Sequence, residues 1–380
     1  MTEPLRVAIA GTGLMARVHA YAWRTAPLVF PSSRVAEVRV LLGRDSERSA
    51  AVASELRIPD YESELEKMLA REDIEVLDVC TPGHTHATLV AAALQAGKHV
   101  LCEKPLGTSV QDSAVMTHAA QLAGLRGVVA MAAYNLRFLP AIQEARRLIS
   151  DGYIGTAVSI RALYLQDWLV SPQTAMSWRL DAVRAGSGAL GDIGSHVVDL
   201  TQYLLGEQIV ETVGLSKTQW PKRPDESGGD RLHDVTTDDL SAWLARFEGG
   251  CTALFEASRL SPTRNNSIRI EIDGTRGAIT FDFDRLNELQ LATSHDDAPP
   301  TGLRRVSVTG PGYPYGDVWW PAGLGLAYDH TFVHLVAELQ SAIEERRVAS
   351  PTFAEALQVQ RVLASVQESD LKRRWMHVRS

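Results

Sequence analysis

The chain has 380 residues, of which 45% are apolar and 22% charged, so it holds enough apolar material for two or three folded domains. Acidic residues outnumber basic ones by 46 to 38, which gives a formal net charge of −8. This balance argues against nucleic acid as a partner, because binding to phosphates requires a basic surface. Apolar runs such as 89–94 are much shorter than the roughly 18 residues of a membrane span, so no membrane association is expected.

The three cysteines, Cys80, Cys102 and Cys251, are far apart and each lies in an apolar run. Their spacing excludes a CxxC metal knuckle and argues against a disulfide framework. The N-terminus lacks the apolar core of a signal peptide, since 7–10 runs directly into a glycine turn. We therefore expect a cytoplasmic, multi-domain enzyme with no metal.

Short apolar strands alternate with helices through the first 132 residues. Strands are expected at 6–10, 38–42, 76–80, 99–102 and 128–132, with helices at about 14–25, 45–56, 85–96 and 109–123. Asp45 and Ser109 suit helix N-caps, the Ser63-x-x-Glu66 capping box suits a further helix start, and Gly97 suits a helix end. This alternation predicts a doubly wound parallel sheet, of the Rossmann type, in a dinucleotide-binding domain at 1–132.

After residue 133 the pattern changes. Helices are expected at about 140–151, 189–205, 329–344 and 353–368, strands at 158–164, 209–215, 240–247, 252–257, 268–273, 278–283 and 288–291, and a long loop at 292–325. Few helices separate these strands. Residues 133–380 are therefore predicted to form a substrate-binding and oligomerisation α/β domain with an open, mainly antiparallel sheet and closing C-terminal helices.

An open sheet with apolar alternation on both faces leaves one face without cover, and a partner sheet is an economical cover. We therefore expect a homodimer or homotetramer. Candidates for the core or the interface are Phe247, Leu254, Ile270 and Phe281.

The first chemical signal is the run Gly11-Thr12-Gly13-Leu14-Met15-Ala16, which follows the first strand and opens the first helix. This GxGxxA pattern suits a pyrophosphate, because the first glycine permits a tight turn, the second close backbone approach, and the alanine close helix–strand packing. The helix N-terminus supplies amide donors and a positive dipole end. A purely structural turn is the alternative, but the position of the run favours dinucleotide binding.

The end of the second strand bears on the choice between NAD and NADP. A carboxylate there would bind the ribose 2′-hydroxyl of NAD, but Gly43 occupies the place, followed by Arg44. A 2′-phosphate is then not repelled, and Arg44 could bind it or stack on adenine. Arg44 could equally be a solvated turn residue, and Asp45 could still reach the ribose. The residues favour NADP slightly and leave NAD open.

Two further signals carry polar chemistry. Glu103-Lys104-Pro105 ends the strand at 99–102, where ligands of open α/β sheets bind, and a lysine there can favour a substrate alkoxide. Asp192 and His196 are four residues apart and share a helix face near the helix start, where the dipole keeps His196 neutral and basic. Asp192 could orient His196 or bind a second substrate hydroxyl. Taken singly, these motifs could also be a surface lysine and a surface ion pair, and one helix supplies too few ligands for a metal.

Together these motifs resemble the glucose–fructose oxidoreductase and inositol dehydrogenase (Gfo/Idh/MocA) family over nearly the whole chain. The resemblance rests on the stretches 11–16, 81–86, 96–106 and 188–200. It implies a Rossmann domain followed by an α/β domain with a large open sheet. It also implies oxidation or reduction of a secondary hydroxyl of a sugar or cyclitol with a nicotinamide cofactor.

Carried over by motif, the resemblance makes Lys104, Asp192 and His196 the catalytic trio. It places Thr81, Pro82, His86 and Glu103 on the nicotinamide side, with His84 departing from the asparagine of many members. A branch acting on anhydrosugars with NAD shares the stretches 164–168, 177–179 and 310–316. Trp168 beside Gln166 suits a sugar, whose apolar face packs on an aromatic ring. The candidate substrate-binding residues are Lys104, Asn135, Gln166, Trp168, Asp192 and His196.

The sequence thus predicts an NAD(P)-dependent dehydrogenase of a pyranose, anhydrosugar or cyclitol, acting on CH–OH. Two rivals stay open. One is an NADPH-dependent keto-sugar reductase in sugar biosynthesis. The other is a non-catalytic dinucleotide-sensing regulator, which would need the glycine turn but not Lys104, Asp192 and His196. Trp319 and Trp320, in the long loop, are expected to overhang the substrate.

Overall fold

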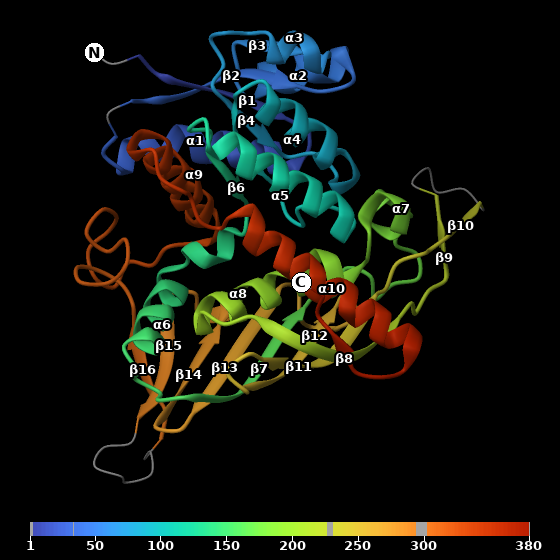
Figure 1. Ribbon diagram of the computed structural model, residues 1–380, viewed down its shortest axis with the longest axis vertical. Helices are drawn as coiled ribbons and strands as arrows, with labels where there is room; N and C mark the ends of the chain where they lie inside the picture. The colour runs from blue at the N-terminus through green and yellow to red at the C-terminus, as the bar shows by residue number, and fades with distance from the viewer. Residues whose placement is uncertain (1–2, 33, 226–230, 294–301, 380) are drawn as a thin grey trace. The chain divides into compact units, whose positions relative to one another are not determined.

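The computed structural model describes residues 3–32, 34–225, 231–293 and 302–379. The chain forms two compact units (Figure 1). Unit 1 comprises residues 1–138 and 327–357, and unit 2 comprises residues 139–326 and 358–380. None of the described helices is long and apolar enough to cross a membrane.

Unit 1 contains a six-stranded sheet in the order β3-β2-β1-β4-β5-β6, and every neighbouring pair is parallel. The strands are β1 (Leu5–Ala10), β2 (Ala36–Leu42), β3 (Asp60–Glu62), β4 (Val76–Val79), β5 (His99–Cys102) and β6 (Ala130–Ala132). All four residues of β4 and all but one residue of β1 are buried, as expected of a parallel sheet covered on both faces. The predicted Rossmann sheet is confirmed, with β3 as an additional short edge strand.

The helices of unit 1 are α1 (Leu14–Val29), α2 (Ser46–Glu55), α3 (Leu65–Leu69), α4 (His86–Gln95), α5 (Val110–Gly124) and α9 (Tyr328–Glu345), with short 3₁₀ turns η1 (Gly83–Thr85) and η2 (Asn135–Phe138). The predicted N-caps are confirmed, since Asp45 accepts from the Arg48 amide and Ser109 from the Asp112 amide. The capping box at Ser63 is wrong. Because β3 runs to Glu62, the helix begins only at Leu65, without a side-chain cap.

The division of the chain differs from the predicted boundary at 132. Residues 327–357, predicted within the second domain, return to complete unit 1. Helix α9 packs against α1, and the ring of Phe332 lies 5.3 Å from that of His19. A sequence pattern shows that α9 has an apolar face but not which distant segment covers it, so the return could not be predicted.

Unit 2 contains a nine-stranded sheet in the order β16-β15-β14-β13-β7-β12-β11-β8-β17, in which β7 and β12 are parallel and the other pairs antiparallel. Its strands are β7 (Ala157–Leu165), β8 (Ile209–Lys217), β11 (Leu240–Phe247), β12 (Thr252–Ser258), β13 (Ser267–Gly274), β14 (Gly277–Asp282), β15 (Glu288–Thr293), β16 (Arg304–Ser307) and β17 (Met376–His377). The open, mainly antiparallel sheet is confirmed. Strands β16 and β17, and the small hairpin of β9 (Lys222–Pro224) and β10 (Leu232–Asp234), were missed because they are too short to show alternation.

Helices cover one face of this sheet (Figure 1). They include α6 (Pro140–Ser150), α8 (Ser195–Leu205) and the second half of α10 (Phe353–Lys372); the short α7 (Ala182–Ala185) lies outside this layer. Helix α8 packs on α6 and β7, and Ser369 of α10 accepts from the Gly214 amide of β8. On the covered side Trp243 stacks on Phe255 at 4.9 Å, and both rings are buried in the core.

The other face carries exposed apolar side chains. Leu244 and Leu254 are directly opposed on β11 and β12 and are 45% and 46% exposed, and Leu215 of β8 is 50% exposed. Of the four candidates for core or interface, Phe247, Ile270 and Phe281 are buried core, and Leu254 lies on this uncovered face.

Candidate active site

The predicted glycine turn joins β1 to α1. Gly11 has φ +124°, and a Cβ there would lie 2.8 Å from the Cys80 carbonyl oxygen, so the position requires glycine. A Cβ on Gly13 would meet no described atom within 4 Å, and no described side chain caps α1. Ala16 is fully buried. The turn therefore offers open space beside uncapped helix amides, which fits a pyrophosphate.

The other candidate cofactor residues of unit 1 follow neighbouring strands. Strand β1 lies between β2 and β4, and β5 is next to β4. Gly43 and Arg44 follow β2, Thr81 and Pro82 follow β4, and Glu103 and Lys104 follow β5. Because carboxyl ends of parallel strands share one edge, the structure brings these residues to the edge where ligands of such sheets bind.

Gly43 lies in close contact with its neighbours. A Cβ there would lie 2.5 Å from Ser49 Oγ and 2.9 Å from Thr12 Cγ2, so a larger residue would require these two side chains to shift. The Asp45 carboxylate accepts from the Arg48 amide at 2.9 Å as the cap of α2, whereas Arg44 is exposed. The edge thus carries an exposed cation where NAD-specific sites carry an acid.

His86 is buried and links two loops. Its Nε2 lies 2.8 Å from the Thr81 carbonyl oxygen and its Nδ1 3.1 Å from that of Leu106. Burial lowers the pKa of His86, so the ring is neutral and donates to one carbonyl at a time. His86 therefore ties the loop after β4 to the loop after β5.

Sequence reasoning missed a buried charged network in unit 1, defined here as His19, Trp23, Asp78 and Glu103. His19 Nδ1 lies 2.9 Å from both Asp78 oxygens and its Nε2 lies 3.0 Å from Glu103 Oε1. The Trp23 indole donates to Asp78 Oδ2 at 2.8 Å. The only available signal was that β4 places an aspartate inside an apolar run.

Burial by itself lowers the pKa of His19, but the adjacent Asp78 carboxylate and Cys80 together outweigh this cost and raise the pKa of His19 well above its usual value. Burial raises the pKa of Glu103, and the bond from His19 reverses this effect, so its pKa is lowered. The network is thus an imidazolium between two carboxylates. Glu103 Oε2 also accepts from the Lys104 amide at 3.0 Å, which connects the network to a candidate catalytic residue.

In unit 2, Asp192 lies in a π-helical turn, η4 (Leu190–Gly194), that leads into α8. The predicted continuous α-helix at 189–205 is therefore wrong over its first turn. Such π turns recur at functional sites. A Cβ on Gly188 would lie 1.8 Å from the Asp238 carbonyl oxygen, so close packing requires this glycine.

The start of this helical segment is capped by a residue that the motif did not reveal. The Asp238 carboxylate accepts from the Gly188 and Leu190 amides, each at 2.7 Å. The amides at this helical start are therefore already paired with a negative charge, which partly neutralises the positive end of the dipole. His196 is 5% exposed, and its ring centroid lies 5.9 Å from that of Tyr164.

Several predicted substrate residues meet in unit 2. The Trp168 indole donates to Gln166 Oε1 at 2.9 Å, and Gln166 Nε2 donates to Asn266 Oδ1 at 2.8 Å. The Tyr164 hydroxyl donates to the same Asn266 oxygen at 2.9 Å. Asp192 Oδ2 accepts from Arg259 Nη2 at 2.6 Å, a partner that sequence reasoning also missed. We call these residues, with His196, the unit 2 cluster.

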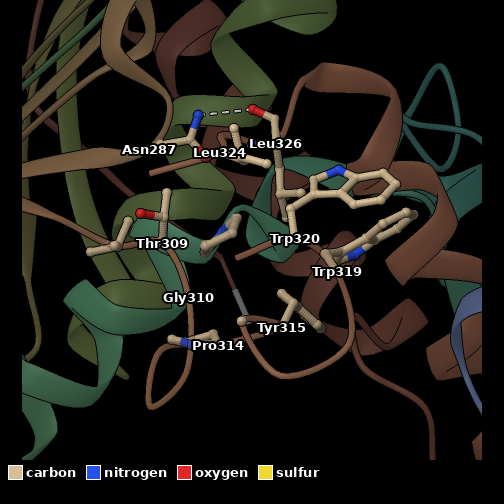
Figure 2. A pocket seen from close by; sticks show the side chains of 12 residues that line it. Asn287, Thr309, Gly310, Pro314, Tyr315, Trp319, Trp320, Leu324 and Leu326 are labelled. Carbon is tan, nitrogen blue, oxygen red and sulfur yellow. Dashed lines mark hydrogen bonds between the residues drawn. The ribbon is translucent and has the colours of Figure 1, made fainter. Parts of the chain in front are cut away.

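Other predicted residues lie outside this cluster. Lys104 and Asn135 belong to unit 1, and the buried Asn135 amide donates to Thr331 Oγ1 at 2.7 Å. Trp319 and Trp320 lie in the loop before α9, where with Tyr315, Leu324 and Asn287 they line a small pocket, and Asn287 donates to the Leu326 carbonyl (Figure 2). Their expected place over the substrate stays a prediction.

Comparison with known proteins gives matches to both parts of the chain. Residues 5–131 match an oxidoreductase family with an NAD-binding Rossmann fold, and residues 142–280 match the GFO/IDH/MocA C-terminal domain. The chain is 37% identical over 389 residues to levoglucosan dehydrogenase of Pseudarthrobacter phenanthrenivorans, which covers 99% of this chain and 98% of that protein.

Two solved structures are similar over the full length of both chains. An oxidoreductase domain protein from Kribbella flavida has a TM-score of 0.96 and 43% identity. Levoglucosan dehydrogenase in complex with NADH and levoglucosan has a TM-score of 0.94 and 35% identity. These matches agree with the resemblance inferred from the motifs.

Proposed function

The chain belongs to the Gfo/Idh/MocA oxidoreductase family, and from this premise we propose that it is a dehydrogenase of an anhydrosugar of the levoglucosan type. The observation that carries the proposal is the unit 2 cluster, in which candidate acid–base groups and a sugar-binding aromatic share one network. The relative named above is called a levoglucosan dehydrogenase, and its solved complex contains NADH and levoglucosan.

The substrate would be recognised through Trp168 and Gln166. The Arg259 guanidinium lies 4.9 Å from the centre of the half-buried Trp168 ring, and Trp168 donates to Gln166. An indole held in this way offers a rigid apolar surface to the C–H face of a compact, bridged sugar ring. Such a rigid surface would discriminate a bicyclic anhydrosugar from a flexible open-chain polyol.

In the proposed oxidation, His196 removes the proton of a secondary hydroxyl and Lys104 stabilises the developing alkoxide. Asp192 binds a neighbouring hydroxyl or supports His196. When bound, the dinucleotide supplies the acceptor for the hydride of that carbon. The product is a keto-sugar.

The cofactor is proposed to be NAD or NADP, with Arg44 able to contact a 2′-phosphate. The absence of a carboxylate at Gly43 permits both cofactors, whereas an Arg44–phosphate contact would favour one of them. The solved relative with bound NADH has 35% identity to this chain. NAD use is therefore compatible with the proposal, and Arg44 would set how strongly NADP binds relative to NAD.

A homo-oligomer is proposed on the uncovered sheet face. Leu215, Leu244 and Leu254 place apolar side chains on neighbouring strands where the helices of unit 2 give no cover. A second copy of the same face would bury them, as isologous dimers commonly do. A homotetramer would require one further contact of this kind.

The test is steady-state activity on a panel of levoglucosan, glucose, myo-inositol and sorbitol, each with NAD and NADP. We expect levoglucosan to give the highest kcat/KM, and Trp168→Ala to lower it through KM more than Trp168→Phe does. Trp375→Phe serves as a matched control on another partly exposed tryptophan of unit 2. Turnover of myo-inositol with none of levoglucosan would refute the anhydrosugar substrate.

A further inference from the structure

The Asp192 carboxylate is held by a fully buried cation, and we propose that Arg259 is the positioning residue of this site. Its guanidinium joins the Asp192 carboxylate to the Trp168 ring, so that an acid–base group and the sugar platform keep one fixed geometry. This inference rests on the proposed function, because Asp192 and Trp168 are assigned to the substrate there.

The backbone of Arg259 is anchored on both sides. It directly follows β12, its amide donates to the Asp239 carbonyl at 2.9 Å, and its carbonyl accepts from the Leu169 amide at 3.1 Å. The second bond fixes the residue next to Trp168. Arg259 thus starts from a rigid point between the sheet and the loop that carries the aromatic ring.

The Arg259 side chain has 0% exposure, and burying a guanidinium is costly unless a counter-charge accompanies it. The Asp192 carboxylate supplies that charge, with Nη2 and Oδ2 only 2.6 Å apart. Within the described residues, Arg259 Nε and Nη1 have no hydrogen-bond partner. Among the described side chains, Asp192 therefore supplies the hydrogen-bond partner of the Arg259 guanidinium.

Asp192 needs such support because of where it lies. It belongs to the π-helical turn η4 rather than to a regular helix, and its side chain is 31% exposed. A half-exposed carboxylate on an irregular turn has several accessible rotamers. Because the carboxylate is planar, holding Oδ2 on Arg259 also fixes the direction in which Oδ1 points.

The other side of Arg259 connects to the remaining cluster. Its Cζ lies 4.9 Å from the centre of the Trp168 ring, a cation–π contact. From Trp168 the hydrogen bonds continue through Gln166 and Asn266 to Tyr164, whose ring lies beside His196. Arg259 is thus the member that connects Asp192 to the chain of side chains reaching His196.

A double-mutant cycle tests the positioning role. Arg259→Met is measured in the wild type and in Asp192→Ala, with kcat and KM for levoglucosan and with NADH affinity by fluorescence titration. We expect Arg259→Met to lower kcat about tenfold to a hundredfold in the wild type, the range of a charge-assisted hydrogen bond. In Asp192→Ala the same change should lower kcat less than about threefold, because no carboxylate remains to be held. NADH affinity should stay unchanged in all variants.

The matched control is Arg223→Met. Arg223 is also fully buried in unit 2, but it donates to the Leu169 and Ser171 carbonyls. Replacing a merely structural arginine should change kcat by the same factor in the wild type and in Asp192→Ala. The effect of Arg223→Met should therefore not depend on Asp192. Arg259→Lys, which keeps the charge but not the planar fork, should recover part of the loss in the wild type only.

Two outcomes overturn the inference and differ from each other. If Asp192→Ala lowers turnover and Arg259→Met adds its full effect to it, Asp192 keeps its proposed role and Arg259 is merely structural. If Asp192→Ala leaves turnover unchanged, the proposed role of Asp192 fails first and the positioning role fails with it. Should Arg259→Met not fold, the cycle is run with Arg259→Lys instead. An equal loss of kcat in the wild type and in Asp192→Ala then contradicts the positioning role, and a loss that vanishes in Asp192→Ala supports it.

Discussion

The two units solve the problem of building a ligand site in different ways. In unit 1 the strands are buried throughout, as in β4, and ligand contacts are offered by turns and helix ends such as Gly11–Gly13. In unit 2 the sheet is half exposed, as in β11, and the candidate site consists of side chains that hold one another. A backbone site depends on the fold alone, whereas a side-chain site depends on each neighbour.

The buried cations of the two units show the same contrast. His19 lies between two carboxylates inside unit 1, and Arg259 lies between one carboxylate and an aromatic ring in unit 2. His19 has a buried charge on each side and supports the interior. Arg259 has a half-exposed partner, Asp192, and supports a surface that can meet a ligand. Removing the first should therefore cost stability, and removing the second should cost activity.

The largest expected effect is on turnover. His196→Ala should lower kcat by about 10²- to 10⁴-fold, because a general base contributes on this scale, and Lys104→Ala should also lower kcat. Cofactor affinity, measured by NADH fluorescence, should change little with His196→Ala, since the glycine turn lies in unit 1. A parallel loss of NADH affinity would indicate a structural role for His196 instead.

The next effect is on the stability of unit 1. His19→Gln should lower the free energy of unfolding by about 3–5 kcal/mol, because it leaves the buried Asp78 and Glu103 carboxylates without their cation. Urea unfolding measures this loss. His99→Gln is the control, since His99 is a partly buried histidine of the same sheet outside the network. A loss no larger than that of the control would show that the network contributes little.

The contribution of His19 should also depend on pH. Its folded pKa is raised well above its unfolded value of about 6.5, so its stabilisation is fully present below that value. It is lost as the pH rises through the raised folded pKa. The stability difference between the wild type and His19→Gln should therefore begin to shrink as the pH rises above about 6.5 and be lost once the pH exceeds the raised folded pKa. A difference that already vanishes near pH 7 would mean that His19 is neutral in the folded protein.

A smaller effect concerns the dinucleotide. Arg44→Ala should weaken NADP binding about tenfold to a hundredfold, since a charge-assisted bond to a phosphate is lost, and should change NAD binding much less. Titration of both cofactors against both proteins measures this. Arg48→Ala, an exposed arginine of α2, is the control. If the wild type prefers NAD by tenfold or more, or the change affects both cofactors alike, Arg44 is only a turn residue.

The smallest expected effect is on protomer stability, in a variant designed to break the oligomer. Leu244→Lys with Leu254→Lys places two charges on the uncovered face and should give monomers in light scattering at micromolar concentration. The stability of the protomer should stay within about 0.5 kcal/mol, as is usual for surface positions. Val183→Lys, at an exposed valine of α7, should leave the assembly unchanged. A wild-type monomer would contradict the proposed interface directly.

The sequence predicted those parts of the molecule whose determinants are local. The strands at 99–102 and 240–247 agree with β5 and β11, and Asp45 and Ser109 cap helices as expected, because hydrophobic period and capping chemistry act over a few residues. Contacts between distant residues were not predictable. Arg259 and Asp238 reach the Asp192 segment from other strands and loops, and no pattern near them marks either residue.

The return of residues 327–357 to unit 1 has a consequence for biosynthesis. Helix α9 supplies buried side chains such as Phe332 and Leu339 to unit 1, and they emerge from the ribosome after the whole of 139–326. The first 138 residues alone would therefore expose the surface of α1 that α9 covers, whereas most of unit 2 is contiguous and can fold as it is translated. The dinucleotide-binding half, although its first 138 residues are made first, therefore cannot finish folding until most of unit 2 has been synthesised.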